Sequence, residues 1–242
     1  MNVLDSLGNP VMVDSPDCAY DQVMKGLHIV STIDFFYPLV DDPYAQGQIG
    51  AANVLSDLYS CGITEIRSVL MILSASSQMK KPEQMIVTRL MMKGFGDKVK
   101  EANSKVVGGQ SVINEYPMIG GAAIGLSREI DPYVPRHAKP GDVLVLTKPL
   151  GSQILVNVNQ YFKNKDAKWK TLSEEKKLIN STEIEDIYEK GLDYLPMLNK
   201  TSAELMLKHG CTSSTDVTGF GILGHSQNLA EVQLAEVDYE IS

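Results

Sequence analysis

The chain has 242 residues, of which 43% are hydrophobic and 21% are charged, a composition typical of a globular protein. Its formal net charge of −8 argues against a nucleic-acid-binding surface, which would require a basic patch. Apolar runs stay well short of the roughly 20 residues that a membrane span needs, and the few scattered cysteines favour a reducing compartment, so a cytoplasmic protein is expected.

The first half of the chain alternates apolar, β-branched runs with stretches of helical periodicity. Strands are expected before residue 25 and over 28–36, 68–76, 104–113 and 116–127. Helices are expected over 48–62, where Gly62 is a typical terminator, and over 81–103. The strand over 104–113 is expected to break at Gly108-Gly109.

The second half predicts fewer strands and more helices. An apolar strand over 143–151 should lead through a turn into a helix, and the charge run over 162–177 is typical of solvated surface. Helical segments should cover 187–210, with a break near Pro196, and should follow a glycine-spaced turn within 211–232.

Strands that alternate with helices indicate an α+β class with α/β-like layers. The turn-rich stretch 135–142 marks a boundary, so domains are expected over residues 1–137 and 138–242. Residues 236–242 have the pattern of a strand that is just beginning. The second domain is therefore expected to be incomplete in this chain.

A single aspartate is most often a cap, a turn residue or a surface charge, and Asp41 and Asp42 before Pro43 fit that interpretation. Four other aspartates stand out by their positions. Asp17 follows a turn and Asp34 ends a strand, while Asp57 lies inside an apolar helix and Asp216 precedes a glycine turn. Acids from separate segments are what a metal–polyphosphate site would need.

Asp57 fits the ordinary interpretation worst, because it lies between Leu55 and Leu58 in the middle of a predicted helix. Asn53 is four residues earlier, so both side chains project from one helix face. A buried carboxylate is costly unless it is paired or binds a metal ion. The Asn53–Asp57 face therefore indicates a site for a cation and a phosphate group.

Two glycine-rich stretches, 106–111 and 216–225, have the composition of turns whose N–H groups can bind phosphate oxygens. Neither is a Walker A or a Rossmann fingerprint. His225 is expected to be a helix-face histidine and not a ligand. Lys148 is left with two interpretations, as a phosphate contact or as a cover for a helix C-terminus.

Taken together, "STIDFFYPLVDDPYAQGQIGAANVLSDLYSCGIT", "VVGGQS", "GDVLVLTKPLG" and "STDVTGFGILGHSQNLA" resemble selenophosphate synthetases (selenide, water dikinases). The resemblance covers nearly the whole chain. It implies an N-terminal domain whose strands form a β-barrel, flanked by helices, across a homodimer, followed by a C-terminal α+β domain. It also implies a reaction in which ATP, selenide and water give selenophosphate, orthophosphate and AMP. Neither a membrane nor a nucleic acid is expected as a partner, given the net charge and the short apolar runs.

The resemblance also implies roles for individual residues. The family's metal-binding acids match Asp17, Asp57 and Asp216, with Asp34 at the strand end beside them. Its nucleotide-contacting positions match Ser15, Pro16, Asp17, Asp34, Asn53, Asp57, Gly108, Gly109, Gln110 and Ser111. The implied cofactors are ATP and Mg²⁺, with K⁺ as an additional candidate ion.

The chain departs from the family pattern before Asp17. Family members carry a glycine-rich loop with a cysteine or selenocysteine and a following lysine, but no Cys-x-x-Lys precedes Asp17 here. Ser15 and Pro16 stand where the family has glycine and a hydrophobic residue. We therefore expect a fragment that lacks the catalytic loop and is inactive as given.

Two alternatives remain at this point. The chain could belong to a dimeric, non-catalytic paralogue that retains the cleft and binds nucleotide or partner proteins. It could also belong to another ATP-dependent enzyme of the same superfamily, whose acceptor would be a phosphorylated purine intermediate and not selenide.

Overall fold

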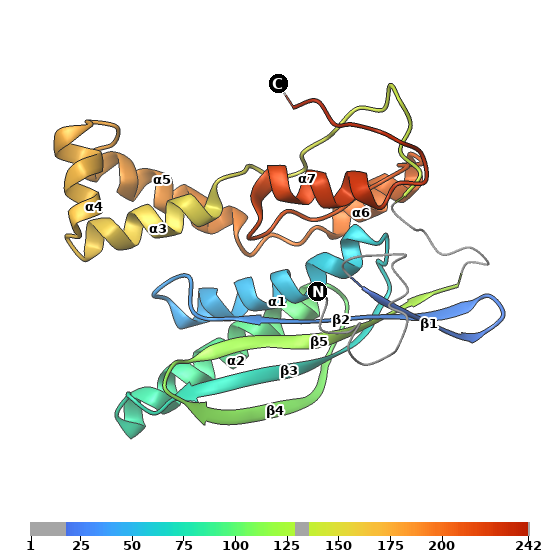
Figure 1. Cartoon of the computed structure of the whole chain (residues 1–242). Coiled ribbons are helices and arrows are strands. Elements are labelled where there is room, and N and C mark those ends of the chain that lie inside the picture. The colour runs from blue at the N-terminus through green and yellow to red at the C-terminus, as the bar shows by residue number, and fades with distance from the viewer. Residues whose placement is uncertain (1–17, 129–135, 242) are drawn as a thin grey trace, which may run out of the picture.

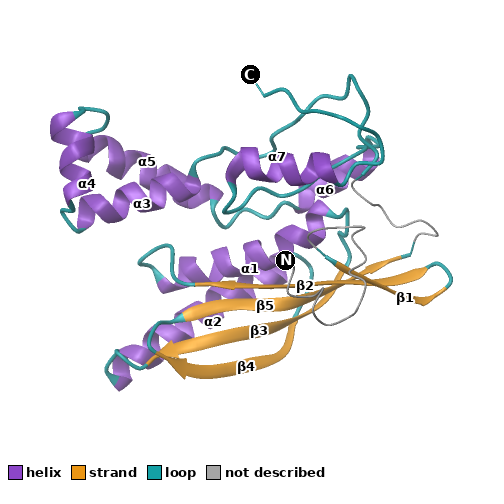
Figure 2. Cartoon of the chain, in the orientation of Figure 1, coloured by secondary structure: helices purple, strands orange, loops and turns teal. Residues whose placement is uncertain are grey.

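The structure, a computed structural model, describes residues 18–128 and 136–241. Within them the chain forms three layers, in which a sheet is covered on one face by helices α1 (Pro43–Ser60) and α2 (Lys81–Glu101), and the C-terminal helices lie above α1 (Figure 1). The expected mixed α+β class is confirmed, and Figure 2 shows the separation of strands from helices. The expected boundary between 137 and 138 stays a prediction.

One five-stranded sheet has the strand order β1-β2-β5-β3-β4. Its strands are β1 (Ala19–Met24), β2 (Leu27–Phe36), β3 (Ile66–Ser76), β4 (Val106–Asn114) and β5 (Met118–Ser127). Only the β3–β4 pair is parallel, and α2 provides the crossover between those two strands. The strands expected in this half of the chain are therefore present, including the short one before residue 25.

The predicted break at Gly108-Gly109 is wrong, because β4 is continuous through both glycines. The ladder pairs Val106 with Val69 and then Gly108 with Leu70, so Val107 is an extra, bulged residue. A Cβ atom on Gly109 would lie 1.9 Å from the Met71 carbonyl oxygen, and its φ is +150°. Gly109 therefore allows two backbones to approach closely, and neither glycine forms a turn.

Helix α1 begins at Pro43, five residues before the predicted start at residue 48, and it has clear signals at both ends. The Asp42 carboxylate accepts a hydrogen bond from the Tyr44 N–H at 2.9 Å, and Pro43 occupies the first turn. At the other end Gly62 adopts φ 71°, and the Ile63 N–H donates to the Leu58 carbonyl at 2.8 Å. This is the glycine-terminated helix end that the sequence predicts.

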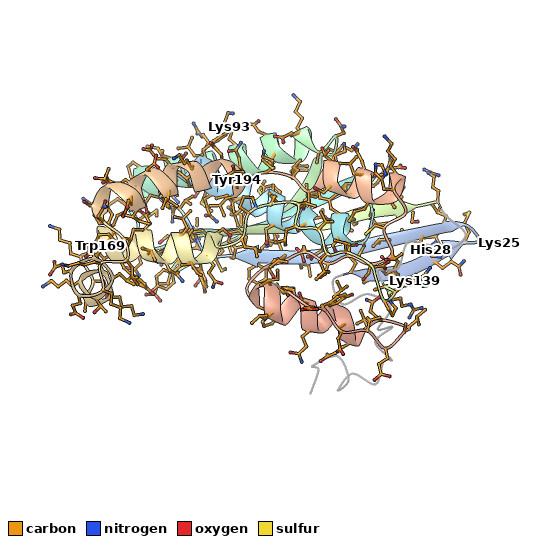
Figure 3. All side chains as sticks on the ribbon, turned by 90° about the horizontal axis from the view of Figure 1, so that it is seen from above. Lys25, His28, Lys93, Lys139, Trp169 and Tyr194 are labelled. Atoms are coloured by element: carbon orange, nitrogen blue, oxygen red, sulfur yellow. The ribbon has the colours of Figure 1, made fainter. Side chains whose placement is uncertain are left out.

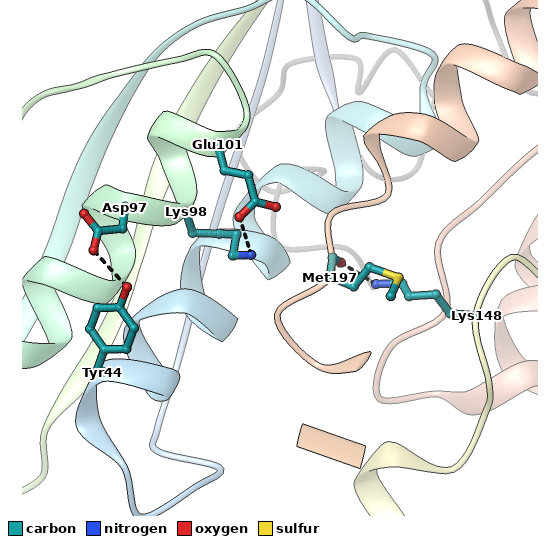
Figure 4. Close-up of polar contacts among 6 residues, drawn as sticks. All are labelled: Tyr44, Asp97, Lys98, Glu101, Lys148 and Met197. Atoms are coloured by element: carbon teal, nitrogen blue, oxygen red, sulfur yellow. Dashed lines mark hydrogen bonds and ion pairs between the residues drawn. The ribbon is translucent and has the colours of Figure 1, made fainter. Parts of the chain in front are cut away.

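Helices α1 and α2 cross with their backbones nearly in contact. A Cβ on Gly47 would lie 2.0 Å from the Met91 carbonyl oxygen, and a Cβ on Gly94 would lie 2.0 Å from the Tyr44 carbonyl oxygen. Nearby, the Tyr44 hydroxyl donates to Asp97 at 2.8 Å (Figure 4). The crossing covers a core whose largest fully buried members include Tyr59, Phe95, Leu55, Leu58 and Leu73.

The C-terminal part is helical. Its elements are α3 (Ser152–Lys163), α4 (Ala167–Lys170), a π-helical turn (Thr171–Glu175), α5 (Ser181–Tyr194), α6 (Lys200–Lys208) and α7 (Gly221–Glu231). The break near Pro196 and the helix after the glycine-spaced turn are confirmed. The charged stretch 162–177 forms the exposed tip of the α3–α5 hairpin, and Figure 3 shows its Trp169 at the opposite end of the molecule from Lys25.

Two predicted strands are wrong. Residues 143–151 and 236–241 form no β-structure, and Val143 and Val145 are 83% and 78% exposed. A strand needs a neighbour for its N–H and C=O groups, and residues 136–241 contain no strand to pair with them. None of the helices in the described ranges is long and apolar enough to cross a membrane.

Candidate functional site

Strand β2 presents a row of increasingly polar side chains to helix α1. Side chains alternate along a strand, so Val30, Thr32 and Asp34 share one face. Val30 is completely buried against the helices and Thr32 is 8% exposed. The opposite face carries Ile33 and Phe35, which are 65% and 50% exposed. The row therefore leads from the dry core to a carboxylate near the end of the strand.

Helix α1 contacts this row through two polar residues. Between Ile49 and Ser60, only Asn53 and Asp57 are partly exposed, and all other residues of that stretch are buried. The Asn53 Nδ2 donates to Asp34 Oδ2 at 2.5 Å, and the Thr32 Oγ1 donates to Asp57 Oδ2 at 2.5 Å. We refer to Thr32, Asp34, Asn53 and Asp57 as the β2–α1 network.

The spacing of the two elements explains why both contacts form together. Two residues along a strand advance by roughly 6.6 Å, and four residues along a helix advance by roughly 6 Å. Thr32 and Asp34 therefore match Asp57 and Asn53 when strand and helix run in opposite directions. Asp34 Oδ1 also accepts the Phe35 N–H at 2.8 Å, which fixes the carboxylate further. Two carboxylates are thus held in defined orientations at a half-exposed position.

The oxygen chemistry of the β2–α1 network suits Mg²⁺, which prefers one or two carboxylates together with phosphate and water oxygens. Within the described residues, no three His, Cys, Asp or Glu side chains gather closely enough to hold a metal ion. Asp216 therefore does not join Asp34 and Asp57 in one cluster. Asp17, Ser15 and Pro16 lie outside the described residues.

Asp216 lies on the loop between α6 and α7. Its Oδ2 atom is buried and accepts no hydrogen bond from the described residues. The loop is tied to helix α1, because the Ser214 hydroxyl donates to the Ser60 carbonyl at 2.5 Å. A second tie joins the same layers through Asn199, which donates to the Ser56 hydroxyl at 3.0 Å. Asp216 is therefore anchored to the helix that carries Asp57.

The stretch Gly108, Gly109, Gln110 and Ser111 does not meet the β2–α1 network within one chain. These residues are exposed on β4, the edge strand, and β5 and β3 separate them from β2. Three strand spacings correspond to about 14 Å. The prediction that this stretch forms a phosphate-binding turn is wrong in its geometry, because the residues are extended.

Lys148 makes a contact with a backbone carbonyl, in line with the interpretation that it covers a helix C-terminus. Its Nζ donates to the Met197 carbonyl at 2.7 Å, just beyond the end of α5 (Figure 4). Burial lowers the pKa of the Lys148 ammonium, the charge of Asp216 opposes that shift, and Lys98 reinforces it. His225 is a buried residue on the α7 face, in line with the expectation of a structural histidine.

Thr32 is the member of the β2–α1 network that the sequence did not single out. Its signal was available, because it lies two residues before Asp34 and thus on the same strand face. A threonine in an apolar strand is usually taken as a β-branched core residue, so its hydroxyl attracts little attention. Only the register between β2 and α1 shows that the hydroxyl binds Asp57.

Comparisons with known proteins agree with this architecture. Residues 15–127 match the model of the AIR synthase related protein, N-terminal domain, and residues 139–241 match that of its C-terminal domain. A solved structure of AaThiL complexed with AMPPCP and TMP has a TM-score of 0.70 at 16% identity and covers 95% of this chain and 67% of its own. Thiamine monophosphate kinase from Aquifex aeolicus has a TM-score of 0.61 at 14% identity, over 85% of this chain and 62% of its own. At these identities the likeness shows the fold alone.

Curated relatives are much closer in sequence. The chain is 50% identical over 217 residues to the selenide, water dikinase of Trypanosoma brucei brucei, which covers 90% of this chain and 55% of that protein. It is 42% identical over 242 residues to that of Dictyostelium discoideum, over 100% of this chain and 65% of that protein. The chain thus spans about half to two thirds of the length of these relatives. Both domain models and these identities show that the chain belongs to the AIR synthase related proteins and is most similar, among the relatives named here, to selenide, water dikinases.

Proposed function

We propose that this chain is the nucleotide-binding part of an enzyme that converts ATP, selenide and water to selenophosphate, AMP and orthophosphate. The observation that carries the proposal is the 50% identity to a selenide, water dikinase over 90% of the chain. The β2–α1 network supports it, because two oriented carboxylates at a half-exposed position are what a nucleotide with its metal ion requires.

The residues of the network would divide the work. Asp34 and Asp57 would hold Mg²⁺, which offsets the negative charge of the phosphates when bound. Asn53 keeps the Asp34 carboxylate in one orientation through its amide, and Thr32 does the same for Asp57 through its hydroxyl. Ser15, Pro16, Asp17 and Asp216 remain proposed contacts for the nucleotide or its metal ions, and K⁺ remains a proposed additional ion.

A homodimer and a cytoplasmic location belong to the same proposal. The sheet face opposite α1 is apolar and is left uncovered by the described residues, since Ile33 and Leu70 are 65% and 40% exposed. Both residues pair with Ala122 of β5, so they flank that residue on the same face of the sheet. A second copy of the chain would bury this face and could complete the expected barrel. Gly108–Ser111 on the edge strand would then lie at or near the contact.

The test is selenide-dependent release of AMP from Mg·ATP by the complete protein. We expect AMP to appear only when selenide is present. AMP or ADP released with a phosphorylated purine intermediate in place of selenide would favour another enzyme of the superfamily. Nucleotide binding without turnover on either acceptor would favour the non-catalytic paralogue and would overturn the proposed reaction.

A further inference from the structure

The loop that carries Asp216 has no regular structure, yet hydrogen bonds attach it at several points. Ser213 accepts a hydrogen bond from Gln233 Nε2 at 3.0 Å, and Ser214 donates to the Ser60 carbonyl at 2.5 Å. On the other side of Asp216, the Thr218 N–H donates to His225 Nε2 at 3.0 Å. Asp216 therefore lies between two attachments, each two residues away.

The attachment at His225 is the one made by a buried ionisable side chain. His225 is 7% exposed on α7, and the centroid of its ring lies 5.6 Å from that of the Phe220 ring. A backbone N–H can only donate, so Nε2 must accept, which requires the neutral ring with its proton on Nδ1. The Thr218 hydroxyl lies 3.1 Å from the same nitrogen. His225 thus provides a directed acceptor for the end of the loop.

Asp216 gives this attachment a purpose. Its Oδ2 is buried without a hydrogen bond from the described residues, a costly state for a carboxylate oxygen. The Lys148 ammonium acts on Asp216 electrostatically, but its hydrogen bond goes to the Met197 carbonyl. An unattached loop would turn Asp216 toward water. Holding the carboxylate in place therefore requires fixed backbone on both sides.

We propose that His225 is a positioning residue for Asp216, which it holds, through Thr218, ready for the cation that accompanies the nucleotide. This role rests on the proposed function, because it gives Asp216 a metal ion to bind. Removal of the acceptor at Nε2 should make residues 215–219 more mobile and lower the affinity for the metal ion, while the packing of α7 remains. Substitution of residues that orient a metal ligand in this way typically lowers metal affinity by about tenfold or more.

The test compares four variants in the complete protein. His225→Leu introduces an apolar side chain of similar size that has no acceptor. His225→Gln places an oxygen acceptor near the Nε2 position. Asp216→Asn removes the ligand charge itself, and His209→Leu changes an exposed histidine on the same part of the chain. Mn²⁺ affinity in the presence of AMPPCP and hydrogen exchange of residues 215–219 are measured together with the melting temperature.

We expect His225→Leu to accelerate hydrogen exchange at residues 215–219 and to lower the affinity for Mn²⁺ by about tenfold. His225→Gln should restore both values to within about twofold, and His209→Leu should change neither. If His225→Leu does not fold, His225→Asn, whose oxygen stops short of the Nε2 position, replaces it in the comparison with His225→Gln.

The outcomes separate the two levels of the hypothesis. Asp216→Asn could lower the affinity for Mn²⁺ while His225→Leu keeps the hydrogen exchange and the Mn²⁺ affinity of the wild type. In that case the positioning role is wrong and the metal role of Asp216 stands. If His225→Gln behaves like His225→Leu, the ring acts by packing and the role is also wrong. If Asp216→Asn binds Mn²⁺ normally, the proposed metal role of Asp216 fails, and the inference fails with it.

Discussion

Asn53 Nδ2 lies 2.5 Å from Asp34 Oδ2, so a carboxamide on α1 holds the carboxylate near the end of β2. The contact joins two residues that are 19 positions apart in sequence and meet only in the folded chain. It is favourable because residue 53 carries a neutral donor. An acceptor with a charge at the same position would reverse its sign.

Asn53→Asp tests this relationship directly, because the two side chains have nearly the same shape. Two carboxylates in contact should lower the stability of the metal-free protein by about 1–3 kcal/mol. Added Mg²⁺ should restore part of the melting temperature by offsetting the charges. Asn228→Asp, on the exposed face of α7, is the matched control. Equal melting temperatures for the two variants without metal would contradict the assigned contact.

Asp57→Asn separates charge from structure. The amide oxygen can still accept the hydrogen bond of Thr32, so the fold should persist. The melting temperature of the metal-free protein should hold or rise, because repulsion between Asp57 and Asp34 is relieved. AMP formation by the complete protein should fall by at least about 10²-fold, as expected for loss of an electrostatic group. Turnover close to that of the wild type would show that the chemistry uses other residues.

Thr32 should matter through its hydroxyl alone. Thr32→Val keeps the β-branched shape in β2 but leaves Asp57 without this donor, at a cost of about 1–3 kcal/mol in the folded state. Thr32→Ser keeps the hydroxyl and should retain most of the affinity for Mg·ATP. Isothermal titration with AMPPCP and Mg²⁺ measures the difference. The assignment fails if valine and serine give the same nucleotide affinity.

The α1–α2 crossing predicts opposite effects for three glycine substitutions. Gly47→Ala and Gly94→Ala each place a methyl group 2.0 Å from a backbone carbonyl oxygen, so the helices must separate. Each should lose about 1–3 kcal/mol or more of unfolding free energy. Gly96→Ala, also in α2, meets nothing within 4 Å and should gain about 0.5–1 kcal/mol from helix propensity. Urea denaturation measures all three, and a uniform loss would contradict the close crossing.

The elements were predictable where the signal is local. The apolar, β-branched run of β2 and the Gly62 terminator of α1 lie within short windows of sequence, and both elements formed as expected, except that α1 begins at Pro43 and not at residue 48. The failures depend on partners. The apolar run at 143–147 has strand composition but no strand beside it, and Gly108-Gly109 reads as a turn until the close approach of β3 is known. The pairing of Thr32 with Asp57 likewise depends on the register between strand and helix, which no single window contains.

The uncovered sheet face predicts the state of assembly. Ile33, 65% exposed, faces away from α1 in the middle of the apolar surface, so Ile33→Lys would place a charge inside the interface with a second copy. Ile154, 69% exposed on α3, is the matched control, and Ile154→Lys should leave assembly unchanged. A specific interface between two copies should bury more than about 1,000 Å².

Analytical ultracentrifugation of the complete protein at micromolar concentration measures the outcome. We expect a dimer for the wild type and for Ile154→Lys, and a monomer for Ile33→Lys. Because Ile33 points away from the β2–α1 network, its substitution should leave the hydrogen bonds of Asp34 and Asp57 intact within each chain. A wild-type monomer, or a dimer that tolerates Ile33→Lys, would show that this face is not where two copies meet.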